Sequence, residues 1–316
     1  MQEESAGPNE RSSSDREMNM YKNIVVAYDG SEYSKSALME ASNWIKRHGG
    51  SAVLVHAVSF DEAESGPIPE QLEKRMHFGK KICYQAKEDL SSVPGLDLES
   101  VICEGEPPET IAEIARAKKA DLIAIGTHGR KGIKKLIMGS VTSGLIGQAP
   151  CDVLVVKKPC KTCKGMYESI LLPFDGSECC KHALKQACRM ASMDGSAVTV
   201  LYVIPRYEEM IGFYRSSSIR SSLMDEAQKI AERAAELALE SGIHVKVLIE
   251  DGDVSGKIAE VAAKEGNDII VMGSYGWSGI NKAVIGSNTE RVIMHADCPI
   301  LVVNSHNRAT KGEEVP

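Results

Sequence analysis

Short apolar runs alternate along the chain with longer segments of helical periodicity. The apolar runs are rich in Val, Ile and Leu and are mostly continuous, as expected of strands that are covered on both faces. Strands are predicted at 23–28, 52–58, 96–103, 122–126, 153–156, 169–174, 197–204, 244–249, 268–273 and 300–303. Helices are predicted at 34–47, 71–90, 110–118, 140–147, 181–193, 222–240, 256–264 and 287–295. This alternation predicts parallel strands joined by right-handed crossovers, and therefore a doubly wound α/β sheet.

The same pattern occurs twice, at an offset of 145 to 147 residues. The tetrapeptide at 29–32 returns at 175–178, the one at 50–53 returns at 195–198, and the tripeptide at 154–156 returns at 301–303. Chance similarity would not hold one offset over separated blocks, and solenoid repeats are far shorter. We therefore predict two tandem five-stranded parallel-sheet domains at 21–158 and 167–305, joined by a linker at 159–166.

The ends and the composition narrow the protein class. Residues 1–20 and 306–316 are polar, and we expect a disordered arm and a disordered tail. The net charge of 37 − 44 = −7 disfavours a general nucleic-acid-binding protein. No run approaches the ~18 apolar residues of a membrane span, and the first residues lack the apolar stretch of a secretory signal. The nine cysteines are sparse and odd in number, which is typical of a cytoplasmic protein with reduced thiols.

Glycines with a repeated spacing follow the fourth predicted strand of each copy. Such a position lies at the carboxyl end of a strand, where open α/β sheets bind ligands. Two glycines separated by two residues are followed nine residues later by a Gly-Ser pair that opens a helix. The residues are Gly126, Gly129, Gly139 and Ser140 in the first copy, and Gly273, Gly276, Gly286 and Ser287 in the second.

This spacing suits a phosphate cradle. Glycines let main-chain N–H groups approach an anion, and a Gly-Ser pair at a helix start adds a hydroxyl and the positive end of the helix dipole. The alternative is that the glycines only turn the chain, which the identical spacing in both copies disfavours. The sequence has no GxxxxGK[ST], no GxGxxG after a first strand and no GxSxG.

An aspartate follows the first strand of each copy, Asp29 and Asp175. A carboxylate in this place can accept a hydrogen bond from a sugar hydroxyl or an exocyclic amine. The sequence Asp-Gly-Ser-Glu is also an arrangement that caps a helix. The residues alone favour neither interpretation.

The doubled Gly-x2-Gly-x9-Gly-Ser pattern, with Asp-Gly-Ser at the end of the first strand, resembles the universal stress protein family over about 21–157 and 167–304. The resemblance implies an adenine nucleotide alpha hydrolase-like fold of five parallel strands that binds ATP, with Mg²⁺ as an optional companion ion. It also implies dimers, or an internal pseudo-dimer in tandem chains whose last strands pair with each other.

The resemblance further implies one nucleotide site per domain. The nucleoside wall would be Ala27, Tyr28 and Asp29 in the first domain, and Pro173, Phe174 and Asp175 in the second. Ala57 and Val203 would meet the adenine. Ribose and phosphates would meet the two sets of glycines and serines, with Val141, Thr142, Asn288 and Thr289. Asn288 departs from the family, which usually has a small apolar residue there.

We therefore expect a cytoplasmic, ATP-binding regulatory or sensor protein of the stress response, with homodimerisation of the whole chain left open. A slow ATPase or nucleotide-dependent phosphotransfer enzyme is one alternative. A catalytic base near the cradle is not repeated in both copies, because the position of His128 in the first copy is occupied by Tyr275 in the second. An interaction scaffold that binds no nucleotide, with a cysteine-based metal or redox site, is the other alternative.

The two predicted sites differ in charge. Arg130, Lys131, Lys134 and Lys135 lie between the glycines of the first copy, whereas Lys282 alone lies between those of the second. Positive charge near phosphates favours ATP, although salt screens exposed charges. We hypothesise that the first domain binds ATP more tightly. The alternative is that residues 130–135 form a solvated loop without a role in binding.

Cys160 and Cys163 form a CxxC in the predicted linker. A closed zinc site usually needs four ligands, so Cys151, Cys179 and Cys180 are the further candidates. A redox pair or incidental thiols are the other interpretations. The apolar contexts of Cys83, Cys103, Cys188 and Cys298 indicate core positions, as does the strand context of His56.

Overall fold

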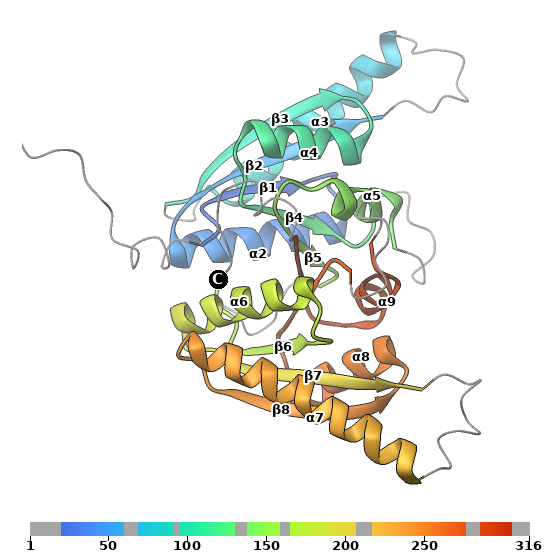
Figure 1. The fold of residues 1–316 in the computed structure, drawn as a ribbon. Coiled ribbons are helices and arrows are strands. Elements are labelled where there is room, and N and C mark those ends of the chain that lie inside the picture. Colours follow the sequence, from blue (N-terminus) through green and yellow to red (C-terminus); the bar gives the residue numbers. More distant parts are fainter. Residues whose placement is uncertain are drawn as a thin grey trace, which may run out of the picture.

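One large sheet, covered by helices on both faces, runs through the chain in the computed structural model (Figure 1). The structure describes residues 20–59, 69–91, 95–129, 138–158, 165–206, 217–275 and 285–304. The predictions made for the terminal segments 1–19 and 305–316, and for 159–164 of the linker, lie outside these ranges. We call residues 20–158 the first half and residues 165–304 the second half.

The elements follow the predicted alternation in both halves. The strands of the first half are β1 (Asn23–Ala27), β2 (Ser51–Val58), β3 (Asp97–Glu104), β4 (Leu122–Gly126) and β5 (Asp152–Val156). Its helices are α2 (Glu32–His48), α3 (Pro69–Asp89), α4 (Pro107–Ala117) and α5 (Ser140–Gln148). The strands of the second half are β6 (Ser169–Pro173), β7 (Ala197–Pro205), β8 (Val245–Gly252), β9 (Ile269–Gly273) and β10 (Ile300–Val303). Its helices are α6 (Glu178–Asp194), α7 (Ser217–Glu240), α8 (Val254–Glu265) and α9 (Ser287–His295).

The strand order is β3-β2-β1-β4-β5-β10-β9-β6-β7-β8, so each half has the same doubly wound order. All pairs within a half are parallel, and the order reverses between β1 and β4 and between β6 and β9. The two halves meet at β5 and β10, which pair antiparallel with Leu154 opposite Leu301. The α/β class and the pairing of the last strands are therefore confirmed. The domain boundaries at 21–158 and 167–305 stay a prediction, since the sheet continues through both halves.

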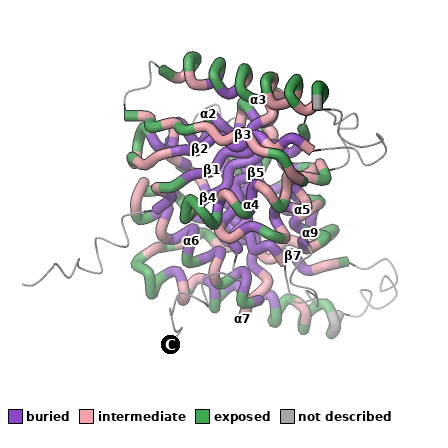
Figure 2. Tube along the Cα trace, turned by 90° about the horizontal axis from the view of Figure 1, so that it is seen from above, coloured by how far each residue is buried: buried purple, intermediate pink, exposed green. Residues whose placement is uncertain are grey.

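Two apolar cores lie on the two faces of this sheet. The first core packs α2, α3, α6 and α7 against one face, and the second core packs α4, α5, α8 and α9 against the other. Figure 2 shows the buried residues concentrated along the strands, with exposed residues on the outer faces of α3 and α7. Each core is shared by both halves, so hydrophobic burial joins them as well as the strand ladder.

Polar contacts also cross between the halves within the first core. Nε2 of Gln186 donates to Oδ2 of Asp152 at 3.1 Å, and the Tyr167 hydroxyl donates to Oε2 of Glu40 at 3.0 Å. Both acceptor side chains are buried, and a buried carboxylate is tolerated when it is hydrogen-bonded. None of the described helices combines the length and apolar character that crossing a membrane requires.

Candidate functional site

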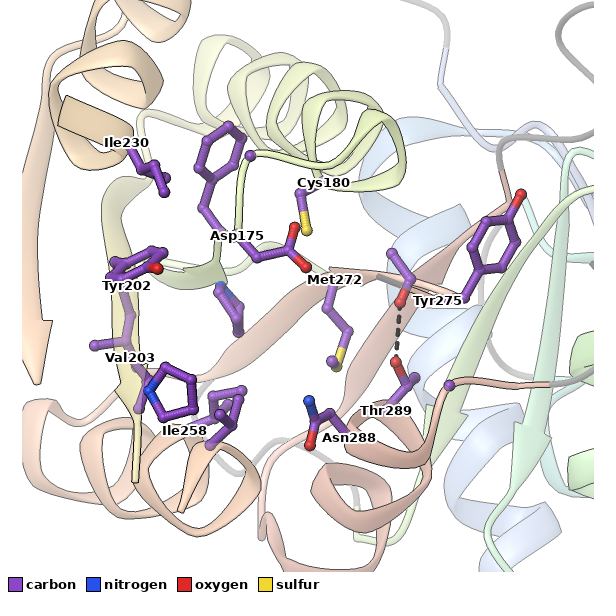
Figure 3. Close-up of a pocket in the computed structure, with 18 of the residues that line it drawn as sticks. Asp175, Cys180, Tyr202, Val203, Ile230, Ile258, Met272, Tyr275, Asn288 and Thr289 are labelled. Carbon is purple, nitrogen blue, oxygen red and sulfur yellow. Dashed lines mark hydrogen bonds between the residues drawn. The ribbon is translucent and has the colours of Figure 1, made fainter. Parts of the chain in front are cut away.

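A cavity of about 890 Å³ opens at the carboxyl ends of β6, β7 and β9 (Figure 3). Its walls also include residues of α7, α8 and the start of α9. The lining contains every described member of the predicted second site: Pro173, Phe174, Asp175, Val203, Gly273, Gly286, Ser287, Asn288 and Thr289. Gly276, the remaining member, lies outside the described residues. The structure thus brings the predicted second site together around one cavity.

The start of α9 forms one wall of this cavity. Gly286 is the residue before the helix, and no side chain caps the helix start. The Gly286 N–H donates to the Ser274 carbonyl at 2.8 Å, and the Thr289 hydroxyl donates to the Gly273 carbonyl at 3.1 Å. The N–H groups in the first turn of an α-helix have no partner inside the helix. The start of α9 therefore offers main-chain donors and a positive dipole end to an anion.

The first half repeats this geometry. Gly139 precedes α5 with φ −61° and ψ 139°, where Gly286 has φ −65° and ψ 139°. The Gly139 N–H donates to the Thr127 carbonyl at 3.0 Å, and the Thr142 hydroxyl donates to the Gly126 carbonyl at 2.8 Å. Two helix starts of the same geometry therefore follow β4 and β9.

Gly126 and Gly273 also have a packing role that the spacing did not reveal. A Cβ at Gly126 would lie 2.6 Å from Cβ of Tyr33, and a Cβ at Gly273 would lie 2.8 Å from Cβ of Cys179. The first turns of α2 and α6 therefore approach the strand ends closely. Glycine is needed here for helix–strand contact, whatever the site binds.

Asp29 and Asp175 hold the turns that lead into α2 and α6. Their Oδ1 atoms accept from the N–H of Ser31 at 3.0 Å and of Ser177 at 2.9 Å. The two serines, rather than the aspartates, are the capping residues of the helices. Asp175 also lines the cavity, and Figure 3 shows its carboxylate directed into it. The carboxylate at this strand end is therefore placed both to hold the turn and to meet a ligand.

The predicted residues of the first half lie at the corresponding edge. Ala27 and Tyr28 are buried at the end of β1, Ala57 is half-buried near the end of β2, and Val141 is half-buried in the first turn of α5. A Cβ at Gly129 would lie 2.9 Å from Oδ2 of Asp29, so this glycine leaves room for the carboxylate. Burial raises the pKa of Tyr28 to about 12, so its hydroxyl stays protonated at neutral pH.

Several lining residues were not predicted. Val254 and Ile258 of α8 and Met272 of β9 form an apolar wall beside Val203. The hydrophobic pattern predicts that these residues are buried, but it does not distinguish a core residue from one that lines a cavity. Tyr202 of β7 and a charged stretch of α7 line the opposite side. The lining members of that stretch are Glu226, Lys229, Ile230 and Arg233.

The basic residues that distinguish the two predicted sites, Arg130 to Lys135 and Lys282, lie outside the described residues. The hypothesis of tighter ATP binding in the first half therefore stays a prediction. His128 is buried, with its ring 5.2 Å from that of Tyr33 and Nδ1 3.1 Å from the Thr127 hydroxyl. His56 is a buried core residue, as predicted, and its Nδ1 lies 2.8 Å from the Tyr28 carbonyl.

The predicted CxxC cysteines, Cys160 and Cys163, lie outside the described residues as well. Cys179 and Cys180 are buried in the first turn of α6, and burial raises the pKa of Cys180 to about 12. A thiol with so high a pKa is a poor nucleophile and a poor metal ligand. Within the described ranges, no three His, Cys, Asp or Glu side chains are grouped so that they could hold a metal ion.

Of the predicted core cysteines, Cys83 and Cys188 are buried, and burial raises the pKa of both to about 11. Cys103 and Cys298 are only partly buried. Cys103 lies near the end of the edge strand β3, and Cys298 lies just before β10.

Comparison with known proteins gives one family. The model of the universal stress protein family matches residues 20–157 and again residues 166–304. A universal stress protein of Thermus aquaticus is 33% identical over 147 residues, which are 44% of this chain and 100% of that protein. A solved universal stress protein of Archaeoglobus fulgidus covers 89% of this chain and 96% of its own, with a TM-score of 0.66 at 18% identity, and shares the fold. A solved universal stress protein in complex with cAMP matches 44% of this chain and 98% of its own, at 24% identity and a TM-score of 0.36. Because the family model matches both halves, the chain belongs to the universal stress protein family, with two family domains in tandem.

Proposed function

We propose that this protein binds an adenine nucleotide, ATP above all, and acts as a regulatory or sensor module of the stress response. The observation that carries the proposal is the composition of the second-half cavity. It joins an uncapped helix start, a carboxylate at a strand end and an apolar wall within one space. Small-molecule sites occupy ~300–1,000 Å³, and the cavity of about 890 Å³ lies within that range.

Each part of the cavity suits one part of the ligand. The apolar wall of Val203, Ile258 and Met272 suits an adenine ring. The Asp175 carboxylate suits a ribose hydroxyl, which donates hydrogen bonds. The N–H groups and the hydroxyl at Ser287 suit phosphate oxygens. A Mg²⁺ ion bound with ATP would neutralise phosphate charge and would take its ligands chiefly from phosphate and water.

The first half is proposed to hold a second nucleotide at Gly139, because its helix start has the same geometry. Its edge also carries Asp29 and Ala57 in the positions of Asp175 and Val203. The expected stoichiometry is two nucleotides per chain.

Matched aspartate variants test this proposal. Gly286→Asp and Gly139→Asp each add a negative charge at one helix start, beside atoms that a Cβ would approach to 3.1 Å. Titration calorimetry is expected to give two ATP per wild-type chain, one per single variant and none for the double variant. ATP at 100 times its Kd should stabilise the native state by about 2.7 kcal/mol for one site. The Kd of the site that remains in each single variant also tests the predicted asymmetry: Gly286→Asp, which keeps the first site, should bind ATP more tightly than Gly139→Asp.

A second measurement makes the outcome independent of added ligand. Mass spectrometry of small molecules released from the heat-denatured protein is expected to detect an adenine nucleotide. If no nucleotide is released, and ATP neither titrates nor shifts the melting temperature of the wild-type chain, the proposed function is wrong.

A further inference from the structure

We propose that the second half carries an additional binding compartment between α6 and α7, for a small molecule that joins an apolar ring or chain to an anionic group. This compartment lies on the other face of the sheet from the apolar wall that we assign to adenine. It therefore goes beyond the proposed nucleotide site, and the two can be tested separately.

The cavity reaches both faces of the sheet. Tyr202 and Val203 are consecutive residues of β7 and so point to opposite faces. Val203 belongs to the second core, on the side of α8 and α9, whereas Phe174 and Cys180 belong to the first core, on the side of α6 and α7. All four residues line the same cavity. Figure 3 shows Ile230 and Cys180 on one side of Asp175, with Asn288 and Thr289 on the other.

The corresponding space in the first half is filled by its own side chains. His56 has the position of Tyr202, since each is the sixth residue of its strand. Nδ1 of His56 lies 2.8 Å from the Tyr28 carbonyl, and its ring lies 6.3 Å from the ring of Phe78. Backbone of α3 comes so close that a Cβ at Gly79 would lie 2.5 Å from Cδ2 of His56.

A comparison of α3 with α7 explains the difference. The two helices align at a constant offset of 148 residues, which pairs Gly79, Ile82, Cys83 and Ala86 of α3 with Ala227, Ile230, Ala231 and Ala234 of α7.

Two pairs in this alignment matter for the compartment: Gly79 with Ala227, and the preceding residues Phe78 and Glu226. Ala227 carries the Cβ that would collide with a ring placed like that of His56. Glu226, an exposed residue, stands where α3 has the aromatic Phe78. The Tyr202 ring therefore lines the cavity, and the compartment under α7 stays open.

The charges around this compartment indicate what it binds. Its mouth is lined by Lys181 of α6 and by Glu226, Lys229 and Arg233 of α7. Lys181 pairs with Glu178 at 2.5 Å, and Arg233 pairs with Glu236 at 3.0 Å. Within the part of the chain that the structure describes, Lys229 has no ion pair.

An unpaired cation beside an apolar interior matches an amphipathic anion. The interior is formed by Phe174, Tyr202 and Ile230, which suit an aromatic ring or a short aliphatic chain. Lys229 supplies the charge for a carboxylate or a phosphate monoester, since it is a point charge without a preferred planar partner. A neutral molecule of the same shape would gain only the apolar contact.

The test uses three probes on the full chain: 1-naphthoate, 1-naphthyl phosphate and the neutral 1-naphthol. Titration calorimetry should give one anionic probe per chain, bound about tenfold more tightly than 1-naphthol. The anion that binds more tightly shows whether the compartment prefers a carboxylate or a phosphate monoester. Lys229→Gln should remove most of that preference, whereas Lys81→Gln, at the corresponding position of α3, should leave it unchanged.

A filling variant locates the compartment. Glu226→Phe places an aromatic side chain where α3 has Phe78, and its exposed position leaves folding intact. It should abolish binding of the anionic probe and leave ATP binding unchanged, whereas Gly286→Asp should do the reverse.

Four results would overturn the proposal. The first is that the wild-type chain shows no saturable binding of either anionic probe, and the second is that 1-naphthol binds as tightly as the anions. The third is that Lys229→Gln and Lys81→Gln lose the preference for the anion equally. The fourth is that Gly286→Asp abolishes binding of the anionic probe whereas Glu226→Phe does not. If ATP binding alone fails, the nucleotide proposal is wrong and this compartment is not affected.

Discussion

Asn288 and Val141 occupy the same position in the two halves, the second residue of the helix that follows the Gly-Ser pair. Val141 is half-buried, whereas Asn288 is exposed and lines the cavity, and Figure 3 shows its amide directed into it. Among the described residues, the Asn288 side chain makes no hydrogen bond. The second half therefore adds an amide donor beside the main-chain N–H groups at the start of α9.

Exchange of these two residues should alter phosphate recognition. Asn288→Val removes the amide donor and is expected to weaken ATP binding in the second half by about 1 kcal/mol, roughly fivefold. Adenosine binding should change little, because adenosine has no phosphate. Calorimetry with both ligands, on Asn288→Val and on the reciprocal Val141→Asn, measures the effect. An equal loss for adenosine and ATP would contradict a role in phosphate recognition.

Among the residues that line the cavity, the sequence analysis named those that directly follow strands but not those on α7. Asp175, Gly286 and Ser287 were predictable because a strand end fixes where its next residues lie. Lys229 and Arg233 lie on the polar face of a helix, and the same pattern is typical of a solvated surface. Their place beside the cavity depends on Ala227 and Tyr202, which come from two different elements.

The C-terminal ends of α2 and α6 meet across the two halves. Nε of Arg47 donates to Oδ1 of Asp194 at 3.0 Å, and Nε2 of His48 lies 3.3 Å from Oδ2 of the same residue. Nε2 of His48 also lies 2.9 Å from the Gly165 carbonyl. Burial lowers the pKa of His48 below its ordinary value; Arg47 and Lys22 lower it further, and Asp194 opposes this shift.

This histidine makes stability depend on pH. Its pKa is lower in the folded chain than in the unfolded chain, where it is about 6.5. As the pH falls below that value, the unfolded chain binds a proton that the folded chain does not, so the free energy of unfolding decreases. His48→Gln removes this term and should show a smaller decrease between pH 7 and pH 5. Urea unfolding at both pH values measures it, and equal decreases in variant and wild type would contradict the assignment.

Periodicity located every described element, because apolar runs covered on both faces contrast sharply with amphipathic helices. The boundaries were less accurate where the ends are polar. The helix predicted at 222–240 begins at Ser217, since its first residues carry no apolar signal. The strand predicted at 244–249 continues to Gly252, because its pairing with β7 holds the polar residues at its end.

The whole molecule depends on the junction of β5 and β10, where a buried carboxylate links the halves. Oδ2 of Asp152 accepts from the Tyr21 hydroxyl at 2.7 Å and from Nε2 of Gln186 at 3.1 Å. Its Oδ1 accepts from the N–H of Asn304, just after β10, at 3.0 Å. The sequence predicted the paired strands only through family resemblance. It gave no signal for this network, since the donors lie far apart along the chain.

Removal of the carboxylate should destabilise both halves together. Asp152→Ala leaves three buried donors without this acceptor and is expected to lower the free energy of unfolding by about 3 kcal/mol. Asp297→Ala is the control, because that exposed residue forms its one ion pair among the described residues with exposed Lys158, at 3.2 Å. A change within about 0.5 kcal/mol is expected. Calorimetric unfolding measures both. A separate loss of one half, with the other unfolding as in the wild type, would contradict the shared junction.

The covalent link between paired halves has an evolutionary consequence. In a symmetric homodimer, each substitution appears in both subunits at once, so the two sites stay identical. Here, β5 and β10 pair within one chain, and each half carries its own codons. Tyr202 in one half can therefore differ from His56 in the other, and Asn288 from Val141. Two family domains in one chain thus permit the corresponding edges of the two halves to diverge on a shared sheet.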